Sequence, residues 1–426
     1  MEERDVDAMF VSKDVKTFEF DQELPSLPVP SLQHTLDRYL DSDEEYRQTE
    51  FLAQQFASGV GKELQNQLLS RAANRKNWLS QYWLDYGYLN CREPLCPMLN
   101  FSGPMPYMNH YLNKTEGSQL HHAAMMTYYY LQCWKLIRLE RLKPDLDSKG
   151  RHMTMDQFRR LFSTCRIPAP QRDHLNAYFK TESEGPTPFH IVVQCRGRIF
   201  VIKAVDDKEE PLTPLELQDQ FQKIRDQCDN QPEGLGIGAL TGENRTTWAQ
   251  SSIMCVILDD TSPQDETEMC QLALAGDSSN RWFDKSLTYV GTKEIRKMEA
   301  PKELVFTVDN VVHRAISNAK LTYNQIANNL QVKINHFTKY GKTFLRKLKL
   351  HPDTHVQMML QYAYYKRHGK PAPTYQTGTT RRFYNARTET VRSCTPEAIE
   401  FAKAMMDPKL TVSPEAVTPT NYKDIW

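Results

Sequence analysis

Apolar residues recur at every fourth position along one stretch of the N-terminal third, and this spacing predicts an amphipathic helix. The stripe is formed by Leu52, Phe56, Val60, Leu64 and Leu68. Gly59 and Gly61 fall inside it, so we expect a kink or close packing there, because glycine weakens a helix interior. A second, largely apolar helix is expected from Ala123 to Leu142.

The pattern is also mostly helical from Pro301 onward. His351-Pro352-Asp353 predicts the start of a helix, and Gly369 and Pro371 predict its end. The apolar positions of this helix are Val356, Met359, Leu360, Ala363 and Tyr364.

A β-hairpin is expected from Phe189 to Val205, where β-branched residues flank a turn at Arg196-Gly197. Leu24–Leu32 contains three prolines and predicts an extended strap, with Ser31 as a candidate N-cap for a short helix through Leu40. No internal repeat or low-complexity tract is present.

Two local patterns have both a functional and a structural interpretation. The aromatic run from Asn77 to Tyr88 could stack on nucleic-acid bases, but it lacks clustered basic residues, so we expect core packing. The glycines of Gly234–Gly238 suggest a dinucleotide loop, yet the third glycine is not at the proper spacing and no clean strand precedes them. We therefore expect a simple turn.

Composition excludes several classes of function. The 426 residues are 40% hydrophobic and 25% charged with a formal net charge of zero, so electrostatics does not favour nucleic acid or an anionic membrane surface. The nine cysteines are scattered and odd in number, which indicates reduced thiols. No apolar run of about 18 residues is present to span a membrane. The acidic start MEERDVDAMF lacks the order of a signal peptide.

The segment Pro371–Ser393 holds the densest candidate chemistry. Its four arginines alternate with threonine, tyrosine and serine hydroxyls, and they are Arg381, Arg382, Arg387 and Arg392. A guanidinium offers a planar fork of donors to carboxylate or phosphate, and hydroxyls both donate and accept. The segment could therefore hold an anionic small molecule, whereas a solvated or salt-bridged strand pair is the structural alternative.

Five motifs, in order, carry a resemblance to a known family. They are LPSLPVPSL, FKTESEG at Phe179–Gly185, Arg196-Gly197-Arg198, NRWFDKS at Asn280–Ser286 and the segment Tyr375–Ser393. Together they resemble the choline/carnitine acyltransferase family over nearly the whole chain. The peptides around Phe162–Cys165 and His351–Thr354 are most similar to its peroxisomal, medium-chain members.

The resemblance implies an α/β fold, the first of two related mixed-sheet acyltransferase domains with helices packed around it and the second domain incomplete. Residues 1–23 would form an N-terminal extension, residues 24–408 the incomplete acyltransferase domain and residues 409–426 a divergent tail. In the family, CoA and carnitine enter a tunnel between the domains from opposite sides. The implied reaction moves a medium-chain acyl group between CoA and carnitine, with acyl-CoA as a substrate and no permanently bound cofactor.

The resemblance also assigns ligands to individual positions. Tyr375 and Thr388 match the tyrosine and threonine that hold the carnitine carboxylate, while the family's arginine partner lies downstream in a half that this chain lacks. The residues matched to the CoA side are Lys342, Arg346, Lys347, Lys349, Asp353 and Thr377. Arg346 stands where a second lysine is usual, which keeps the charge but changes the geometry. A solvated helix face is the structural alternative for Lys342–Lys349.

The family's chemistry needs a histidine base, hydroxyls for the tetrahedral oxyanion and cations for the CoA phosphates. The histidine peptide follows the strand matched by Ser286–Val290, but here Gly291 comes next, so no catalytic residue is assigned. We expect deleted blocks at 290–291 and at 250–251, and a smaller gap near Ser42-Asp43.

Other histidines do not replace the missing base. His313 is expected on the surface, and the adjacent His121 and His122 are expected to be structural. His351 and His355 share a helix face but form an incomplete zinc site, so no metal is expected. The four arginines of Pro371–Ser393 are expected to be ion-pair partners rather than ligands.

Three functions remain open: an active carnitine acyltransferase, an inactive shortened isoform or gene-model fragment, and a CoA- or carnitine-binding module. The expected partners are acyl-CoA and carnitine, with no nucleic acid and no membrane span, for a monomer. The family implies the peroxisome, but Asp424-Ile425-Trp426 does not resemble a peroxisomal signal, which leaves the cytoplasm as the alternative. Deleted strands should expose apolar faces and sheet edges and give a poorly stable or insoluble product.

Overall fold

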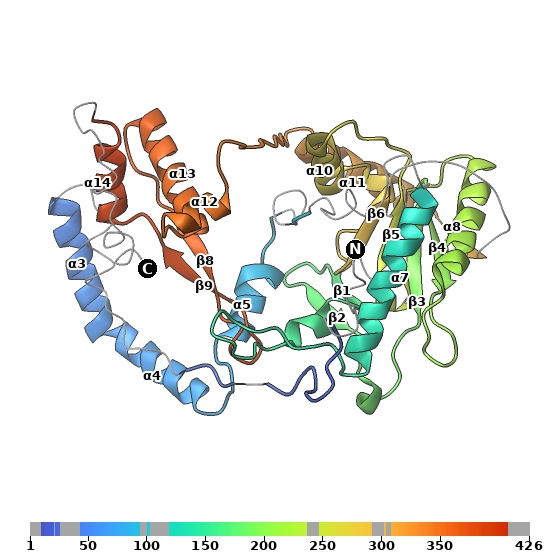
Figure 1. Ribbon diagram of the computed structural model, residues 1–426, viewed down its shortest axis with the longest axis horizontal. Coiled ribbons are helices and arrows are strands. Elements are labelled where there is room, and N and C mark those ends of the chain that lie inside the picture. The colour runs from blue at the N-terminus through green and yellow to red at the C-terminus, as the bar shows by residue number, and fades with distance from the viewer. Residues whose placement is uncertain are drawn as a thin grey trace. The chain divides into compact units, whose positions relative to one another are not determined.

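The computed structural model divides into two units, each built from segments that are distant in the sequence (Figure 1). One unit combines Met1–Asp21 with Gln81–Ile334, and the other combines Gln22–Ser80 with Asn335–Trp426. The described residues are 10–20, 22–25, 43–93, 100–102, 119–236, 247–291, 302–303 and 308–407. The proline strap beyond Pro25, the helix expected after Ser31 and the tail at 409–426 lie outside them.

A five-stranded mixed sheet forms the centre of the first unit, in the order β6–β5–β3–β4–β7. The strands are β3 (His190–Cys195), β4 (Arg198–Lys203), β5 (Cys255–Leu258), β6 (Thr288–Gly291) and β7 (Lys302–Glu303). β5 is parallel to β3 and β6, whereas β4 is antiparallel to β3 and β7. The expected α/β class, with a mixed sheet and helices packed around it, is confirmed.

The hairpin between β3 and β4 is also confirmed. Arg196 and Gly197 both have positive φ, 47° and 73°, which is the backbone that a two-residue hairpin turn requires. The glycine-rich stretch docks onto this turn, since the amide of Gly234 donates to the Arg196 carbonyl at 2.9 Å and that of Gly236 donates to the Gly197 carbonyl at 3.2 Å. Residues 234–236 are irregular backbone rather than the expected turn, with Gly236 at a φ of 68°, and the remainder of the stretch lies outside the described residues.

Two helices cover one face of the sheet. α7 (Gln119–Arg138) and α8 (Pro214–Asp229) lie side by side against it (Figure 1). Trp134 of α7 and Phe221 of α8 share the main core with Val193 of β3. The second core on the opposite face contains Val192, Cys255, Ile257 and Trp282. Burial on both faces explains why the central strands are mainly apolar, although β3 also buries His190 and Gln194.

The first unit holds several shorter elements, with α5 starting at its boundary. They are α5 (Ser80–Leu84), the π-helix η1 (Asp85–Leu89), η2 (Asp156–Arg160), β1 (Thr164–Ile167), β2 (His174–Ala177), η3 (Glu182–Glu184), α9 (Thr247–Ser251), α10 (Glu266–Ala275), η5 (Ser278–Asn280) and α11 (Asn310–Ala327). β1 and β2 form an antiparallel pair. Among the described residues, no helix combines the length and the apolar character needed to cross a membrane.

The second unit is an antiparallel hairpin accompanied by helices. Its elements are α3 (Asp43–Ser58), α4 (Val60–Ala72), α12 (Lys342–Lys347), α13 (Pro352–His368), β8 (Tyr375–Thr379), β9 (Thr388–Arg392) and α14 (Pro396–Ala404). The expected ends of α13 are confirmed: the His351 side chain accepts from the Thr354 amide, and Gly369 closes the helix with φ of 68°. The expected kink is the break at Gly59 between α3 and α4.

The apolar stripe is largely exposed, and so is part of the aromatic run, although core packing is expected for that run. The apolar stripe lies on α3 and α4, but Leu52 is 60% exposed and Val60 is 56% exposed. In the aromatic run, Tyr86 is 73% exposed and Tyr88 is 44% exposed, so that run is not core along its length. Periodicity identifies the side of a helix that favours burial, but burial also requires a second apolar surface to pack against.

Candidate functional site

One face of the β8–β9 hairpin collects the hydroxyls of the segment Pro371–Ser393. Its cross-strand pairs are Tyr375 with Arg392, Thr377 with Thr390 and Thr379 with Thr388. Paired residues project to the same side of a hairpin and alternate residues share a face, so these six side chains lie on one face. The hairpin therefore brings together three assigned residues, Tyr375, Thr388 and Thr377.

Tyr375 and Thr388 occupy opposite ends of this face. Tyr375 begins β8, whereas Thr388 pairs with the last residue of that strand, Thr379. At about 3.3 Å per residue, the two backbone positions are roughly 13 Å apart along the strand. Tyr375 is 65% exposed, so its long side chain has space to lean along the hairpin toward Thr388. A ligand that contacts both must lie across the middle of the face.

Side-chain hydrogen bonds fix both ends of the hairpin. At the turn, the Thr380 hydroxyl donates to the Arg387 carbonyl at 2.6 Å and accepts from the Arg387 amide at 2.8 Å. At the open end, Gln361 Nε2 of α13 donates to the Ser393 carbonyl at 2.8 Å, and the Ser393 hydroxyl donates to Thr374 Oγ1 at 3.2 Å. The hydroxyl face is therefore carried on a backbone that is held in place.

The four arginines of this segment have different surroundings. The Arg382 guanidinium lies 5.7 Å from the centroid of the Phe383 ring, and Arg381 and Arg387 also have interaction partners. The Arg392 side chain is exposed and makes no hydrogen bond or ion pair with any described residue. Within the described residues neither Arg382 nor Arg392 forms an ion pair, so the expectation that all four act as ion-pair partners is wrong for these two.

Four of the residues assigned to CoA form an exposed basic segment on and just after α12. They are Lys342, Arg346, Lys347 and Lys349. Leu345 is 5% exposed and anchors the short helix, while Lys349 follows it with a positive φ of 60°. Within the described ranges, none of the four basic side chains forms a hydrogen bond or an ion pair. Four uncompensated charges within eight residues give a positive surface that suits phosphate groups.

The start of α13 carries the assigned acidic residue, the exposed Asp353. The nearby histidines have structural partners. His351 caps the helix, and His355 Nε2 lies 3.0 Å from the Tyr340 hydroxyl. Burial lowers the pKa of His355. Across the described ranges, no three His, Cys, Asp or Glu side chains are arranged to hold a metal ion.

The other histidines behave as expected. His313 is exposed on α11, and His121 Nδ1 pairs with Gln218 Oε1 at 3.2 Å.

The two expected deletion points lie at opposite ends of adjacent strands of the first unit. Gln250 and Ser251 end α9, shortly before β5, and the Gln250 carbonyl accepts from Lys285 Nζ at 2.8 Å. Gly291 ends β6, and its carbonyl accepts from Gln119 Nε2 at 2.6 Å. Both junctions are therefore tied into the folded sheet.

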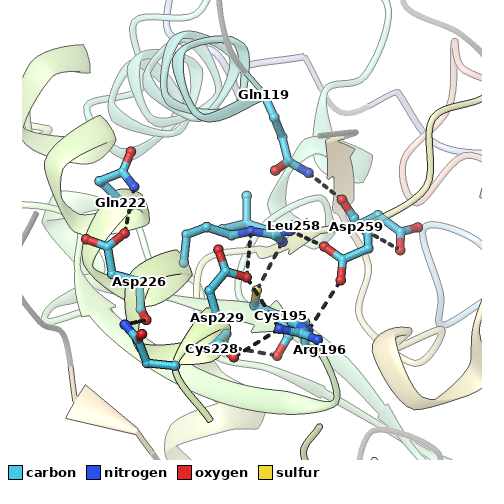
Figure 2. A network of polar contacts seen from close by, with 12 residues as sticks. Gln119, Cys195, Arg196, Gln222, Asp226, Cys228, Asp229, Leu258 and Asp259 are labelled. Atoms are coloured by element: carbon cyan, nitrogen blue, oxygen red, sulfur yellow. Dashed lines mark hydrogen bonds and ion pairs between the residues drawn. The ribbon is translucent and has the colours of Figure 1, made fainter. Parts of the chain in front are cut away.

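A polar network that the sequence did not predict lies at the carboxyl ends of the parallel strands (Figure 2). Arg225 is 1% exposed, pairs with Asp260 and approaches Cys195 Sγ at 3.6 Å. A hydrogen bond from Cys228, assisted by the charge of Arg225, lowers the pKa of Cys195. The same hydrogen bond, together with burial, raises the pKa of Cys228. This end of a parallel sheet is where α/β proteins commonly bind ligands. Here, however, the charged groups are paired with one another, which indicates a structural role.

Comparison with known proteins gives a match to the family model described as choline/carnitine O-acyltransferase. The match covers residues 27–251, 250–297 and 290–418 in three sections. The breaks between the sections fall at 250–251 and at 290–297, next to the two expected deletion points.

Curated relatives extend along most of the chain. Peroxisomal carnitine O-octanoyltransferase from Mus musculus is 37% identical over 471 aligned positions, which cover 94% of this chain and 77% of the relative. The protein of the same name from Rattus norvegicus is 38% identical, over 93% of this chain and 76% of the relative. Choline O-acetyltransferase from Sus scrofa is 30% identical, and the alignment covers 90% of this chain and 71% of that relative. The 471 aligned positions exceed the 426 residues of this chain, so the mouse relative contains residues with no counterpart here.

Proposed function

This chain belongs to the choline/carnitine O-acyltransferase family, and from that membership we propose that it binds acyl-CoA and carnitine, with a medium-chain acyl group as the one transferred. The name and the 37% identity of the mouse octanoyltransferase support the medium chain length. CoA enters this proposal as a substrate and not as a resident cofactor.

The observation that carries the proposal is the chemistry of the second unit. Its hairpin offers a hydroxyl face on which Tyr375 is exposed and Thr388 is half-buried, and these hydroxyls suit a carboxylate. Its basic segment offers four uncompensated cations, which suit the phosphates of CoA. Asp353 at the start of α13 and Thr377 on the hydroxyl face would complete the CoA side.

The proposed reaction is a single acyl transfer. The carnitine hydroxyl loses its proton to a base as its oxygen attacks the thioester carbonyl. The tetrahedral oxyanion then collapses with cleavage of the C–S bond, and the base returns the proton to the departing sulfur, which leaves as the CoA thiol. We assign binding to residues of this chain but assign the base to none of its histidines. Loss of a general base slows such a step by about 10²–10⁴-fold.

A second candidate, an inactive shortened form of such an enzyme, is favoured by a specific observation. The family match breaks at 250–251 and 290–297, and the mouse alignment is longer than this chain. We propose that the general base belongs to residues absent after Val290. The domain at 24–408 and the divergent tail at 409–426 are part of this proposal.

A thiol-release assay with octanoyl-CoA and carnitine tests both candidates. The chain as it stands is compared with a variant that carries the mouse relative's residues at both junctions. We expect release only from the extended variant, and a lower rate when Tyr375→Phe is added to it.

Release from the original chain at the rate of the extended variant would exclude the inactive form. No release from either protein, with no carnitine binding by calorimetry, would overturn the acyltransferase proposal. Sequencing the transcript across Gln250–Ser251 and Val290–Gly291 shows whether the deletions are real.

We propose a peroxisomal location from the names of the octanoyltransferase relatives, with the cytoplasm as the alternative. We also propose a monomer as the binding form. Fluorescence microscopy of the tagged chain with a peroxisomal marker tests the first proposal, and light scattering at low protein concentration tests the second.

A further inference from the structure

Arg392 carries the only charge on the hydroxyl face of β8–β9. The register places it directly across from Tyr375 at the open end of the hairpin. Directly opposed residues on antiparallel strands have Cβ atoms about 4.5–5.5 Å apart. The Arg392 guanidinium and the Tyr375 hydroxyl can therefore reach one ligand group from two sides.

No described carboxylate neutralises Arg392. Its side chain is exposed and has no hydrogen bond or ion pair within the described ranges. The closest acidic residue on the same strand, Glu389, pairs with Gly378 and so belongs to the opposite face. The planar donor fork of Arg392 is therefore available to an anion that arrives from solvent.

We propose that Arg392 binds the carboxylate of carnitine together with Tyr375, as the charged partner of the neutral hydroxyls on this face. The inference rests on the proposed function. Tyr375 and Thr388 supply only neutral hydroxyls, whereas a bidentate, charge-assisted contact from arginine is about twice as strong as a neutral one. The contact makes carnitine the preferred ligand over choline, which has a hydroxyl and a trimethylammonium group but no carboxylate.

Calorimetry on the full chain tests this role with three probes: carnitine, choline and adenosine 3′,5′-bisphosphate. The variants are Arg392→Gln and Arg392→Lys. Arg382→Gln is the matched control, because Arg382 belongs to the same segment but stacks on Phe383. We expect Arg392→Gln to weaken carnitine binding tenfold or more, with choline and the bisphosphate unchanged. Arg392→Lys should lose less affinity for carnitine than Arg392→Gln does, and the control should bind all three probes like the wild type.

A comparison of carnitine with carnitinamide on the wild type needs no variant. The amide keeps the size of the ligand but removes its negative charge, so we expect the same loss of affinity as for Arg392→Gln. Equal carnitine affinity in wild type and Arg392→Gln would overturn the inference and leave the proposed function intact. If Arg392→Gln weakened the binding of the bisphosphate alone, the inference would be overturned in favour of a contact between Arg392 and CoA. If it weakened the binding of all three probes equally, Arg392 would have a structural role. Absence of carnitine binding in the wild type would overturn both the inference and the proposed function.

Discussion

At the scale of single residues, a buried ion pair at the end of β5 makes a sharp prediction. Arg281 Nη2 lies 2.6 Å from Asp259 Oδ2, and the two side chains are 2% and 7% exposed. Arg281→Met would leave the Asp259 charge buried without its partner, which costs about 3–5 kcal/mol of unfolding free energy. Urea denaturation measures the loss.

The matched control for this variant is Lys223→Met on α8. Lys223 pairs with Asp219 at 2.7 Å, but those side chains are 22% and 38% exposed. A pair in contact with water contributes about 0–1 kcal/mol. Equal losses in the two variants would show that burial of the Arg281 pair carries no special cost.

Lys285 predicts a dependence of stability on pH. It is 5% exposed, and burial lowers its pKa from 10.5 to about 8, partly offset by Cys165 and Cys255. The folded state therefore gives up the proton at a lower pH than the unfolded state does. Between pH 8 and 10.5 the unfolded chain binds more protons, so the unfolding free energy contributed by this group rises with pH.

The measurement is the difference in unfolding free energy between wild type and Lys285→Met at pH 7, 8 and 9. We expect the difference to be flat below pH 8. Above pH 8 it should shift in favour of the wild type, by up to about 1.4 kcal/mol per pH unit. A difference that stays constant across this range would contradict the buried, low-pKa lysine. Cys133 and Tyr289 have pKa values raised by burial, so their titration lowers the unfolding free energy as pH rises. Both proteins share these two groups, so the difference between wild type and variant cancels their effect.

These residues mark the limit of what the sequence predicts at this scale. The residue types needed for anion binding in Pro371–Ser393 are visible in the sequence, and the family resemblance selects Tyr375 and Thr388 as the candidate carnitine ligands. The pairing of Arg392 with Tyr375 is not visible, because it depends on the length of the turn between β8 and β9. The burial of Lys285 is also hidden, since it follows from strands that approach from distant parts of the chain.

At the scale of elements, the sequence was most informative where a few adjacent residues decide the geometry. The Arg196-Gly197 turn and both ends of α13 are local signals of this kind. The order of the strands is not local, because β5 lies between β3 and β6 only after helices connect them. The exposure of α3 and α4 shows the same limit, since periodicity does not identify the partner surface.

The N-terminus of α8 gives a prediction for a single element. The Thr213 hydroxyl accepts from the Glu216 amide at 3.3 Å, and the Glu216 carboxylate accepts from the Thr213 amide at 2.8 Å. Thr213→Ala removes one half of this capping box and should cost about 1 kcal/mol of unfolding free energy. Thr213→Ser keeps the hydroxyl and should retain most of the stability. An alanine variant as stable as the serine variant in urea would argue against the cap.

At the scale of the whole molecule, the two units do not follow the order of the chain. The second unit joins residues from both ends, since the Tyr384 amide donates to the Gln22 carbonyl at 2.7 Å and Asn77 Nδ2 donates to the Tyr384 carbonyl at 2.6 Å. A family resemblance is visible along the whole chain, but these long-range contacts are not, because they form only in the folded unit. All eight residues assigned to carnitine and CoA nevertheless fall within this one unit.

The apolar stripe on α3 and α4 predicts how the whole chain behaves in solution. Leu52 and Phe56 of the stripe are 60% and 50% exposed, and Phe51, which adjoins the stripe next to Leu52, is 64% exposed. Large exposed apolar patches promote association because their contact releases water from apolar surface. We expect the chain to be monomeric when dilute and to associate as concentration rises.

In Phe51→Ser/Phe56→Ser, light scattering should show association only at several-fold higher concentration, with an unchanged melting temperature, because the removed rings contribute little to the core. Leu215→Ser on α8 is the control, since Leu215 is 77% exposed but lies outside the stripe. Equal gains in solubility from the control and the double variant would show that general surface hydrophobicity, and not this stripe, drives association.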